Sequence, residues 1–114
     1  MNLPFSPSRE AGGFVFLSGQ GGFDESGGLA DTIEAQTEQT LRNVARLLEE
    51  NGCTTADVVA CLVHLADLGD FGRFNEVYAR HFDEPRPTRT TVEARLVAGM
   101  RVEITAVARR PSRA

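Results

Sequence analysis

Apolar and polar positions alternate along this chain in a way that predicts both strands and helices. Residues 13–18 (GFVFLS) are apolar at successive positions, which is typical of a strand covered on both faces. Because the chain has 114 residues, too few for a second domain, we expect a second subunit to supply one of those covers. Residues 58–66 (VVACLVHLA) form a longer apolar and β-branched run, which predicts a central strand.

Residues 31–50 carry the spacing of an amphipathic helix. Asp31 and Glu34 predict a capping box at its start, and Gly52 predicts its end. Charged residues occupy the opposite face. One apolar stripe faces the core and consists of Ile33, Thr37, Leu41, Val44 and Leu48.

A second helix is expected from Asp70, which can act as its N-cap, to about Phe82. Pro85 and Pro87 follow and prevent its continuation. The side chains expected to point inward are Phe71, Phe74, Val77, Tyr78 and Phe82.

The last part of the chain predicts a hairpin. Residues 89–96 and 101–109 alternate between apolar and polar side chains. A three-residue loop centred on Gly99 keeps apolar residues opposite apolar residues. The facing pairs in this register are Leu96 with Val102, Arg95 with Glu103, and Arg89 with Arg109.

The predicted order of elements is β–β–α–β–α–β–β in a single domain over residues 1–114. Residues 19–28 contain five glycines in ten positions and are expected to form the loop that precedes the first helix. We therefore predict an α+β domain with a mixed sheet and both helices on one of its faces.

Composition and charge exclude several classes of function. The net charge is −4, and nucleic-acid binding needs a basic surface. All twelve basic residues are arginine, so a lysine Schiff base, a covalently held pyridoxal cofactor and a lysine-containing phosphate loop are excluded. No apolar run approaches the roughly 20 residues of a membrane span. Without a recognisable secretory signal, we expect a cytoplasmic protein.

The cysteines and histidines give little evidence for a metal or a nucleophile. Cys53 and Cys61 are expected to be buried, reduced thiols, because their spacing fits neither a disulfide framework nor a zinc knuckle. His64 lies inside the predicted central strand, and His81 lies near the end of the second helix. No catalytic-nucleophile signature accompanies them, so we expect structural or surface roles and no metal site.

Three polar residues are candidates for a binding or catalytic site. Arg89 could hold a planar carboxylate through two parallel hydrogen bonds, or form an ordinary ion pair with Glu93. Glu103 could likewise pair with Arg95. Asn75 interrupts the apolar side of the second helix, and a hydrogen bond to a loop or a site role would account for it equally well. For Arg89 and Glu103, composition alone favours the ion pairs.

A series of short motifs covers nearly the whole chain. They are FVFLSGQ at 14–20, EAQTEQTLRNV at 34–44, DVV at 57–59, LAD at 65–67, DF at 70–71, FNEVY at 74–78, PTRTTVE at 87–93 and VEITAVA at 102–108. In this order the motifs resemble those of the reactive-imine deaminases, also called the Rid, YjgF or UK114 proteins.

The resemblance implies a chorismate-mutase-like α+β fold and a homotrimer with sites in the clefts between subunits. The implied activity is hydrolysis of 2-imino acids to 2-keto acids and ammonia without a cofactor. Arg89 would bind the substrate carboxylate, and Glu103 would position or deprotonate the attacking water. Ser18 and Gly19 would line the pocket, and Asn75 would lie near it.

Some residues depart from the family pattern. Phe5 stands where the family commonly has a tyrosine, so a hydroxyl near the pocket is lost. Thr91 stands where a cysteine is frequent, although its carbonyl could still contact water or substrate. Two loops also look shorter. Two alternatives therefore stay open: a diverged hydrolase acting on another enamine or imine, and a non-catalytic trimer that binds keto acids.

The hairpin register gives an independent expectation about the site. In this register Arg89 lies six residues along the strand from Glu103, which is about 20 Å at roughly 3.3 Å per residue. One small imino acid cannot span that distance. We therefore expect the Arg89 and the Glu103 of one site to come from different subunits.

Overall fold

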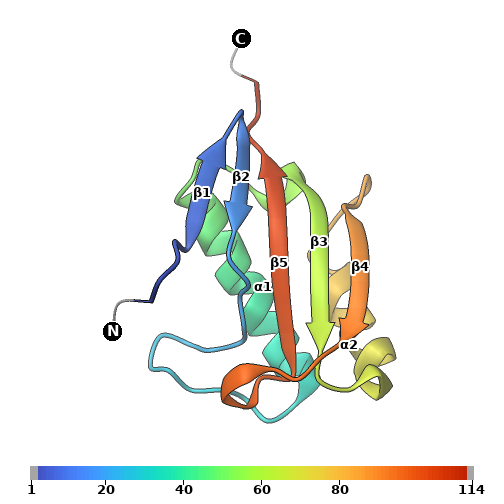
Figure 1. Ribbon diagram of the computed structural model, residues 1–114. Coiled ribbons are helices and arrows are strands. Elements are labelled where there is room, and N and C mark those ends of the chain that lie inside the picture. Colours follow the sequence, from blue (N-terminus) through green and yellow to red (C-terminus); the bar gives the residue numbers. More distant parts are fainter. Residues whose placement is uncertain (1–2, 113–114) are drawn as a thin grey trace.

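Five strands form one mixed sheet in the order β1-β2-β5-β3-β4, and two helices pack on one of its faces (Figure 1). The computed structural model describes residues 3–112. The elements are β1 Ser8–Ala11, β2 Phe14–Leu17, α1 Ile33–Glu49, β3 Val58–Leu65, α2 Phe71–Ala79, β4 Thr88–Glu93 and β5 Val102–Arg109. The predicted α+β class, the order of elements and the placement of both helices are confirmed.

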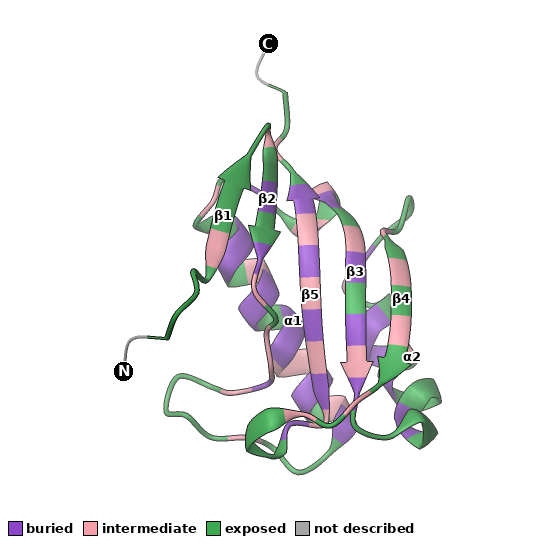
Figure 2. Ribbon diagram, viewed as in Figure 1, coloured by how far each residue is buried: buried purple, intermediate pink, exposed green. Residues whose placement is uncertain are grey.

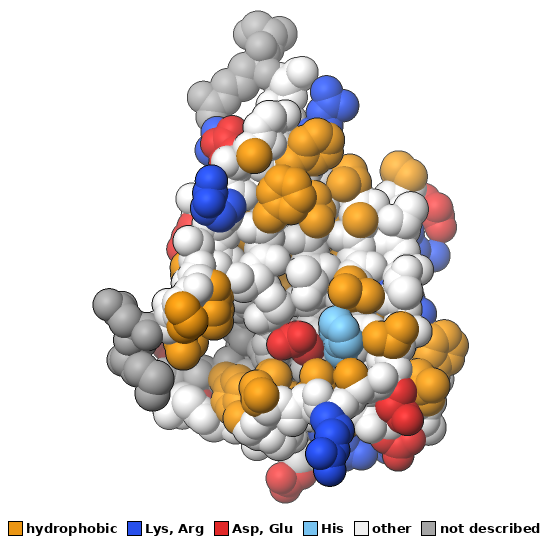
Figure 3. Space-filling view, in the orientation of Figure 1, with side chains coloured by type: hydrophobic (Ala, Val, Ile, Leu, Met, Phe, Trp, Pro, Cys, Tyr) orange, Lys and Arg blue, Asp and Glu red, His pale blue; other side chains and the backbone are white. Residues whose placement is uncertain are grey.

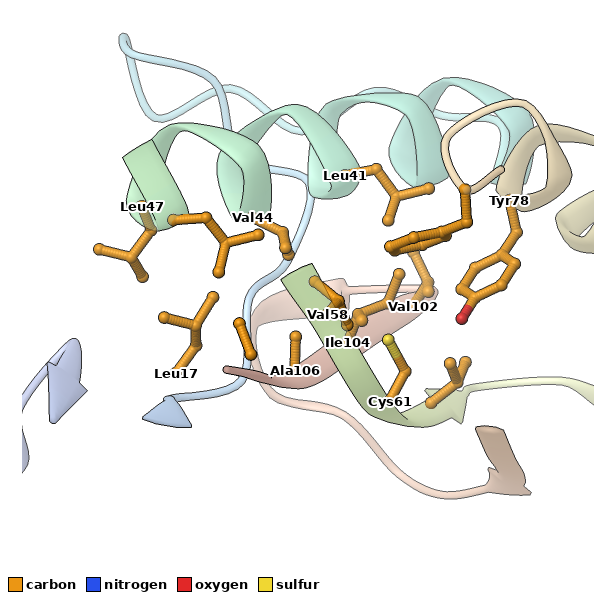
Figure 4. Packing of buried hydrophobic residues seen from close by; sticks show 14 of the residues in the cluster. Leu17, Leu41, Val44, Leu47, Val58, Cys61, Tyr78, Val102, Ile104 and Ala106 are labelled. Carbon is orange, nitrogen blue, oxygen red and sulfur yellow. The ribbon is translucent and has the colours of Figure 1, made fainter. Parts of the chain in front are cut away.

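The core lies between the sheet and the helices. Alternate residues of β3 and β5 are buried, which appears as bands along both strands in Figure 2. From α1, Leu41 and Val44 point toward the sheet, where Ile104 and Ala106 lie (Figure 4). Burial of each large apolar side chain stabilises the fold by about 1.5–3 kcal/mol. The helix-facing positions are therefore fixed by packing, and the positions between them point to the open face.

The ends of α1 differ slightly from the prediction. The N-cap is Thr32, whose backbone is extended and whose hydroxyl accepts a hydrogen bond from the Ala35 amide at 3.1 Å. The predicted capping box at Asp31 is therefore wrong by one residue. Gly52 does end the helix: its φ of +75° is in the left-handed region that glycine adopts without strain. All five members of the predicted stripe are buried.

Helix α2 begins after Asp70, at the predicted position, and ends at Ala79, three residues before the predicted end. The predicted capping by Asp70 is wrong: its side chain makes no capping hydrogen bond and contacts Arg73 and Arg101 instead. Phe82 is buried beyond the end of the helix, so it still belongs to the core. Phe71, which was predicted to point inward, is 43% exposed. It lies at the first turn, where its ring contacts the guanidinium of Arg89 instead of the core.

The predicted hairpin between β4 and β5 is wrong. β3 lies between these strands and pairs in parallel with β4 and antiparallel with β5, so Cys61 faces Arg89 on one side and Ala106 on the other. The strand β4 ends at Glu93, and the following residues cross the end of β3. Alternation alone does not determine which strand lies alongside. It also gave the wrong relative faces here, because the predicted hairpin puts Arg89 and Glu103 on one face, whereas Arg89 is level with the buried Cys61 and Glu103 with His64. The pairs predicted from the hairpin, including Arg95 with Glu103, do not form.

The glycine-rich loop before α1 is tied to that helix. The Asn43 side-chain amide donates to the carbonyls of Gly21 and Phe23, each at 2.9 Å. A Cβ on Gly22 would lie 2.7 Å from the Gln36 carbonyl oxygen, so the loop approaches α1 too closely for any larger residue. These contacts position the segment that follows β2, where Gly19 lies.

We expect Asn43→Ala to lower the free energy of unfolding by about 1–3 kcal/mol, because the partly buried carbonyls of Gly21 and Phe23 lose their hydrogen-bond donor. Urea denaturation would measure the change. Arg42→Ala is the matched control: it removes an exposed ion pair with Glu38 from the neighbouring position and should change stability by less than about 1 kcal/mol. Equal stabilities of the two variants would contradict the proposed anchoring of the loop.

Candidate functional site

Glu103 projects from β5 onto the open face of the sheet, opposite the helices. It faces His64 of β3 in the strand register, and the His64 Nδ1 atom lies 3.7 Å from the Glu103 Oε1 atom. Both side chains are about a quarter exposed. Figure 3 shows an acidic side chain and a histidine side by side on this face, surrounded by hydrophobic side chains. The open face therefore carries a charged group in partly apolar surroundings.

Gly19 makes room for this carboxylate. A Cβ on Gly19 would lie 2.7 Å from the Glu103 Cδ atom, a distance that real Cβ atoms do not tolerate. The next residue, Gln20, exchanges two backbone hydrogen bonds with Ile104, at 2.8 and 2.9 Å. Pairing of this loop with β5 thus places the glycine backbone against the Glu103 side chain, and Gly19 belongs to the candidate site.

Ser18 and Phe5 line one shallow pocket, together with Arg9 and Phe16. The Ser18 hydroxyl donates to the Ser6 carbonyl at 2.6 Å, which ties the N-terminal segment to the end of β2. The Phe5 ring is 60% exposed. The structure therefore brings Ser18 and Phe5 together, next to the Gly19 backbone.

Arg89 lies on β4, the edge strand, on the face that the helices cover. Its guanidinium carbon is 5.6, 5.2 and 4.7 Å from the ring centroids of Phe71, Phe74 and Tyr78. Such stacking holds the cation while leaving its in-plane N–H donors available. Within residues 3–112 it forms no ion pair. The expected alternative, pairing with Glu93, does not occur: that carboxylate accepts from the Leu68 amide at 2.9 Å.

A pocket opens beside Arg89. It is lined by Asn75, Tyr78, Ala79, Arg86, Pro87 and Arg89. The Asn75 Oδ1 atom is buried and has no hydrogen-bond partner in the described part of the chain, so this oxygen makes no bond to a loop. Thr91 follows on the same face of β4, opposite Val63, and is half-buried. The pocket is thus lined by two arginines, Arg86 and Arg89, by Asn75 and by one aromatic side chain, Tyr78.

Arg89 and Glu103 point to opposite faces of the sheet. Arg89 is level with Cys61, which is buried under the helices, whereas Glu103 is level with His64 on the open face. The predicted distance of about 20 Å depended on the hairpin and is withdrawn with it. Two side chains on opposite faces of one sheet cannot contact one small ligand. That the Arg89 and the Glu103 of one site come from different subunits therefore stays a prediction.

The remaining ionisable groups do not form a second centre. Cys53 and Cys61 are free and buried, as predicted, and burial raises the pKa of both thiols. His81 lies 2.9 Å from Glu38, and this hydrogen bond lowers the pKa of the Glu38 carboxyl. Among residues 3–112 no three His, Cys, Asp or Glu side chains gather as metal ligands would. No helix in that range is both long and apolar enough to cross a membrane.

His64, for which the sequence predicts a structural or surface role, lies beside Glu103 on the open face. One feature of the sequence distinguishes His64: it is the only basic side chain in the apolar run 58–66. Its outward position follows from the same alternation that buries Val63 and Leu65. Its neighbour could not be predicted, because the wrong hairpin placed Glu103 beside another strand.

Comparison with known proteins identifies the family. A family model described as Endoribonuclease L-PSP matches residues 2–110. The chain belongs to this family. A RutC family protein of Pyrococcus horikoshii is 40% identical over 108 residues, which are 92% of this chain and 86% of that protein. A mouse protein named 2-iminobutanoate/2-iminopropanoate deaminase is 36% identical over 108 residues, covering 92% and 80%.

A solved structure agrees with the sequence relatives. RidA from an Antarctic Psychrobacter bacterium superposes with a TM-score of 0.90 at 37% identity, covering 93% of this chain and 88% of that one. The resemblance to the Rid proteins seen in the sequence motifs is therefore confirmed. The α+β fold with two helices on one sheet face is the fold of this family.

We expect Gly19→Ala to turn the Glu103 carboxylate away from His64, because the new methyl group would occupy its place. The end of a glutamate side chain is flexible, so the free energy of unfolding should change by less than about 1 kcal/mol. The imidazole NMR signals of His64 would report the movement. Gly72→Ala is the control, since a Cβ there meets no atom within 4 Å. Unchanged His64 signals in Gly19→Ala would contradict this view of the loop.

Proposed function

We propose that this Rid-family protein hydrolyses 2-imino acids, or their enamine tautomers, to 2-keto acids and ammonia, without a cofactor. The observation that carries the proposal is Arg89, a cation held by three aromatic rings with no ion-pair partner among residues 3–112. Members of the family that carry the name of such a deaminase support the choice of substrate.

Arg89 would bind the substrate carboxylate. A guanidinium and a carboxylate are both planar, and two parallel charge-assisted hydrogen bonds fix position and orientation together. The aromatic rings prevent the cation from turning away. Asn75 supplies a hydrogen-bond acceptor in the same pocket, suited to an N–H of the substrate. This arrangement favours a small ligand with a carboxylate beside a nitrogen.

Glu103 would act on the attacking water. The imine carbon is already electrophilic, so water adds to it when a base accepts one of the water protons. Return of that proton to the imine nitrogen gives a carbinolamine. The hydroxyl proton of the carbinolamine then passes to the same nitrogen, the carbon–nitrogen bond breaks, and ammonia leaves as the keto group forms. One carboxylate can accept and return the proton. Orientation and proton transfer are then sufficient, with no metal or cofactor required.

The other candidate residues would shape the pocket. Gly19 keeps the backbone close to Glu103, and the hydroxyl of Ser18 fixes the neighbouring N-terminal segment that carries Phe5. Thr91 lies two residues beyond Arg89 on the same face of β4, where its side chain or carbonyl can contact the ligand. Because Phe5 has no hydroxyl, this wall of the pocket is more apolar than a tyrosine would make it.

The complete site would lie between subunits of a homotrimer. Within one chain the two main residues face opposite sides of the sheet, so a second subunit has to bring its Arg89 to the open face that carries Glu103. That face also exposes apolar side chains at Phe14, Phe16 and Leu62. Contiguous apolar surface of this kind marks a protein interface. A trimer is the assembly implied by the family resemblance.

Two other functions rest on weaker support. The altered pocket wall at Phe5 is compatible with another enamine or imine as the substrate, or with keto-acid binding without turnover. The family model carries the word endoribonuclease, but the net charge of −4 is unfavourable for contact with RNA phosphates. Hydrolysis assays with 2-iminopropanoate separate these cases.

We expect Arg89→Ala to reduce kcat/KM for 2-iminopropanoate by roughly 100-fold, equivalent to about 3 kcal/mol for a bidentate charged contact. An amino acid oxidase would generate the imine in the cuvette, and its decay would be followed with each variant. Arg80→Ala, at the exposed end of α2, is the control and should behave as wild type. Wild-type rates in Arg89→Ala would exclude Arg89 as the carboxylate ligand.

A mixing experiment tests the location of the site. Arg89→Ala and Glu103→Gln should each be inactive alone, yet mixed trimers should recover activity. In a random one-to-one mixture about one site in four contains both intact residues, so about a quarter of the wild-type rate is expected. The subunits would be mixed in denaturant and refolded together. A mixture as inactive as its components would show that Arg89 and Glu103 do not share a site across an interface.

A further inference from the structure

His64 occupies an unusual position on the open face of the sheet. Its Nδ1 atom is buried and has no hydrogen-bond partner in the described part of the chain. The nearest acidic oxygen is Glu103 Oε1, at 3.7 Å, and the two residues are a directly facing pair of β3 and β5. A buried ring nitrogen without a partner normally costs free energy. The unpaired Nδ1 atom of His64 therefore indicates a hydrogen bond that a small movement of a neighbouring side chain would complete.

The surroundings of His64 leave one partner for that nitrogen. On the β4 side its register neighbour is Val92, which is apolar. Leu62 precedes it on the same face of β3 and is also apolar. Arg101 lies near the end of β5 but is directed elsewhere, toward the Asp31 carbonyl and the Asp70 carboxylate. Among the described residues, Glu103 is thus the ionisable group that faces the imidazole.

We propose that His64 is a positioning residue for Glu103: its Nδ1–H donates to one carboxylate oxygen and directs the other toward the attacking water. This inference rests on the proposed function, since it gives Glu103 its orientation for that reaction. An ionised carboxylate only accepts hydrogen bonds, so the ring nitrogen facing it must carry the proton. The distance of 3.7 Å exceeds a hydrogen bond of about 2.7–3.2 Å. Contacts of this kind are often long before the ligand binds and shorten afterwards.

Gly19 and His64 together limit how the carboxylate can turn. The glycine backbone occupies one side, where even a methyl group would collide with the Glu103 Cδ atom. The imidazole lies across the strand pair on the other side. A carboxylate between a backbone wall and a hydrogen-bond donor has fewer orientations than a glutamate on an open sheet. Turnover, more than substrate binding, should depend on this restriction, because the carboxylate of the substrate is bound by Arg89.

Replacement of His64 separates an effect on turnover from an effect on substrate binding. We expect His64→Leu to lower kcat for 2-iminopropanoate by about 10-fold or more and to leave KM within about 2-fold. In His64→Asn the side-chain amide places an N–H near the position of Nδ1, so kcat should return to within about 3-fold of wild type. His81→Asn is the matched control, because His81 pairs with Glu38 at the end of α2 and should not affect turnover.

The outcomes decide the proposal. Wild-type kcat in His64→Leu would overturn it, and so would a His64→Asn variant that is no faster than His64→Leu. Thermal unfolding and sedimentation would establish that each variant is folded and assembled. If His64→Leu fails this check, His64→Asn alone decides, since it preserves the donor and should stay within about 3-fold of wild type.

A measurement that needs no activity distinguishes this inference from the proposed function. The chain has two histidines, so ¹⁵N-histidine labelling gives two resolved rings. At alkaline pH the neutral His64 ring should carry its proton on Nδ1 in the wild type and on Nε2, the form preferred by free imidazole, in Glu103→Ala. The ring nitrogen of His81 that carries the proton should be the same in both proteins. A wild-type His64 protonated on Nε2 would overturn the positioning role. If His64 of the wild-type protein carries its proton on Nδ1 but the protein does not hydrolyse imines, only the proposed function would be overturned.

Discussion

The two faces of the sheet impose the constraint on which the rest of the structure depends. Side chains alternate along a strand, so each residue of β3, β4 and β5 belongs either to the helix-covered face or to the open one. Packing against α1 and α2 fixes that choice, because a shift by one residue would expose the whole core. Arg89 and Glu103 are consequently held on opposite faces. A site that uses both can be completed only when another subunit covers the open face.

The polar side chains of α1 extend this constraint to the loop that reaches Glu103. Asn43 and Gln36 are two of the four buried polar residues of α1, with Thr37 and Thr40. Asn43 holds the glycine-rich loop, and the Gln36 amide group bonds Ala30 through its nitrogen and the backbone of Arg101 through its oxygen. Buried polar groups are stable only with such partners. The same bonds that satisfy the helix therefore hold the loop that follows Gly19, and the pairing of Gln20 with Ile104 places Gly19 against the Glu103 side chain.

Periodicity was sufficient to predict the order of elements and the buried stripe of α1, because both depend on local spacing. It could not predict that β3 separates β4 from β5, because alternation does not identify the neighbouring strand. The hairpin that it suggested placed Arg89 and Glu103 on one face, whereas they lie on opposite faces. Motif resemblance indicated Arg89, Glu103 and Gly19 as candidates, but His64, the residue that faces Glu103, could not be predicted because it depends on which strand lies alongside. Phe71 shows a related limit: its spacing is that of a core residue, yet the nearby guanidinium gives its ring a different contact.

The charge of Arg89 also explains why such a site suits an anionic ligand. A guanidinium removed from water without a counter-ion is unfavourable by several kcal/mol, and stacking on aromatic rings offsets only part of that cost. In the proposed assembly a second subunit would exclude water from the pocket, which would raise the free energy of the unpaired guanidinium further. The carboxylate of the proposed substrate would supply the missing counter-ion, and in a pocket of low polarity its attraction to the guanidinium would be stronger than in water. Within one chain Glu103 cannot take that part, because it lies on the other face of the sheet from Arg89.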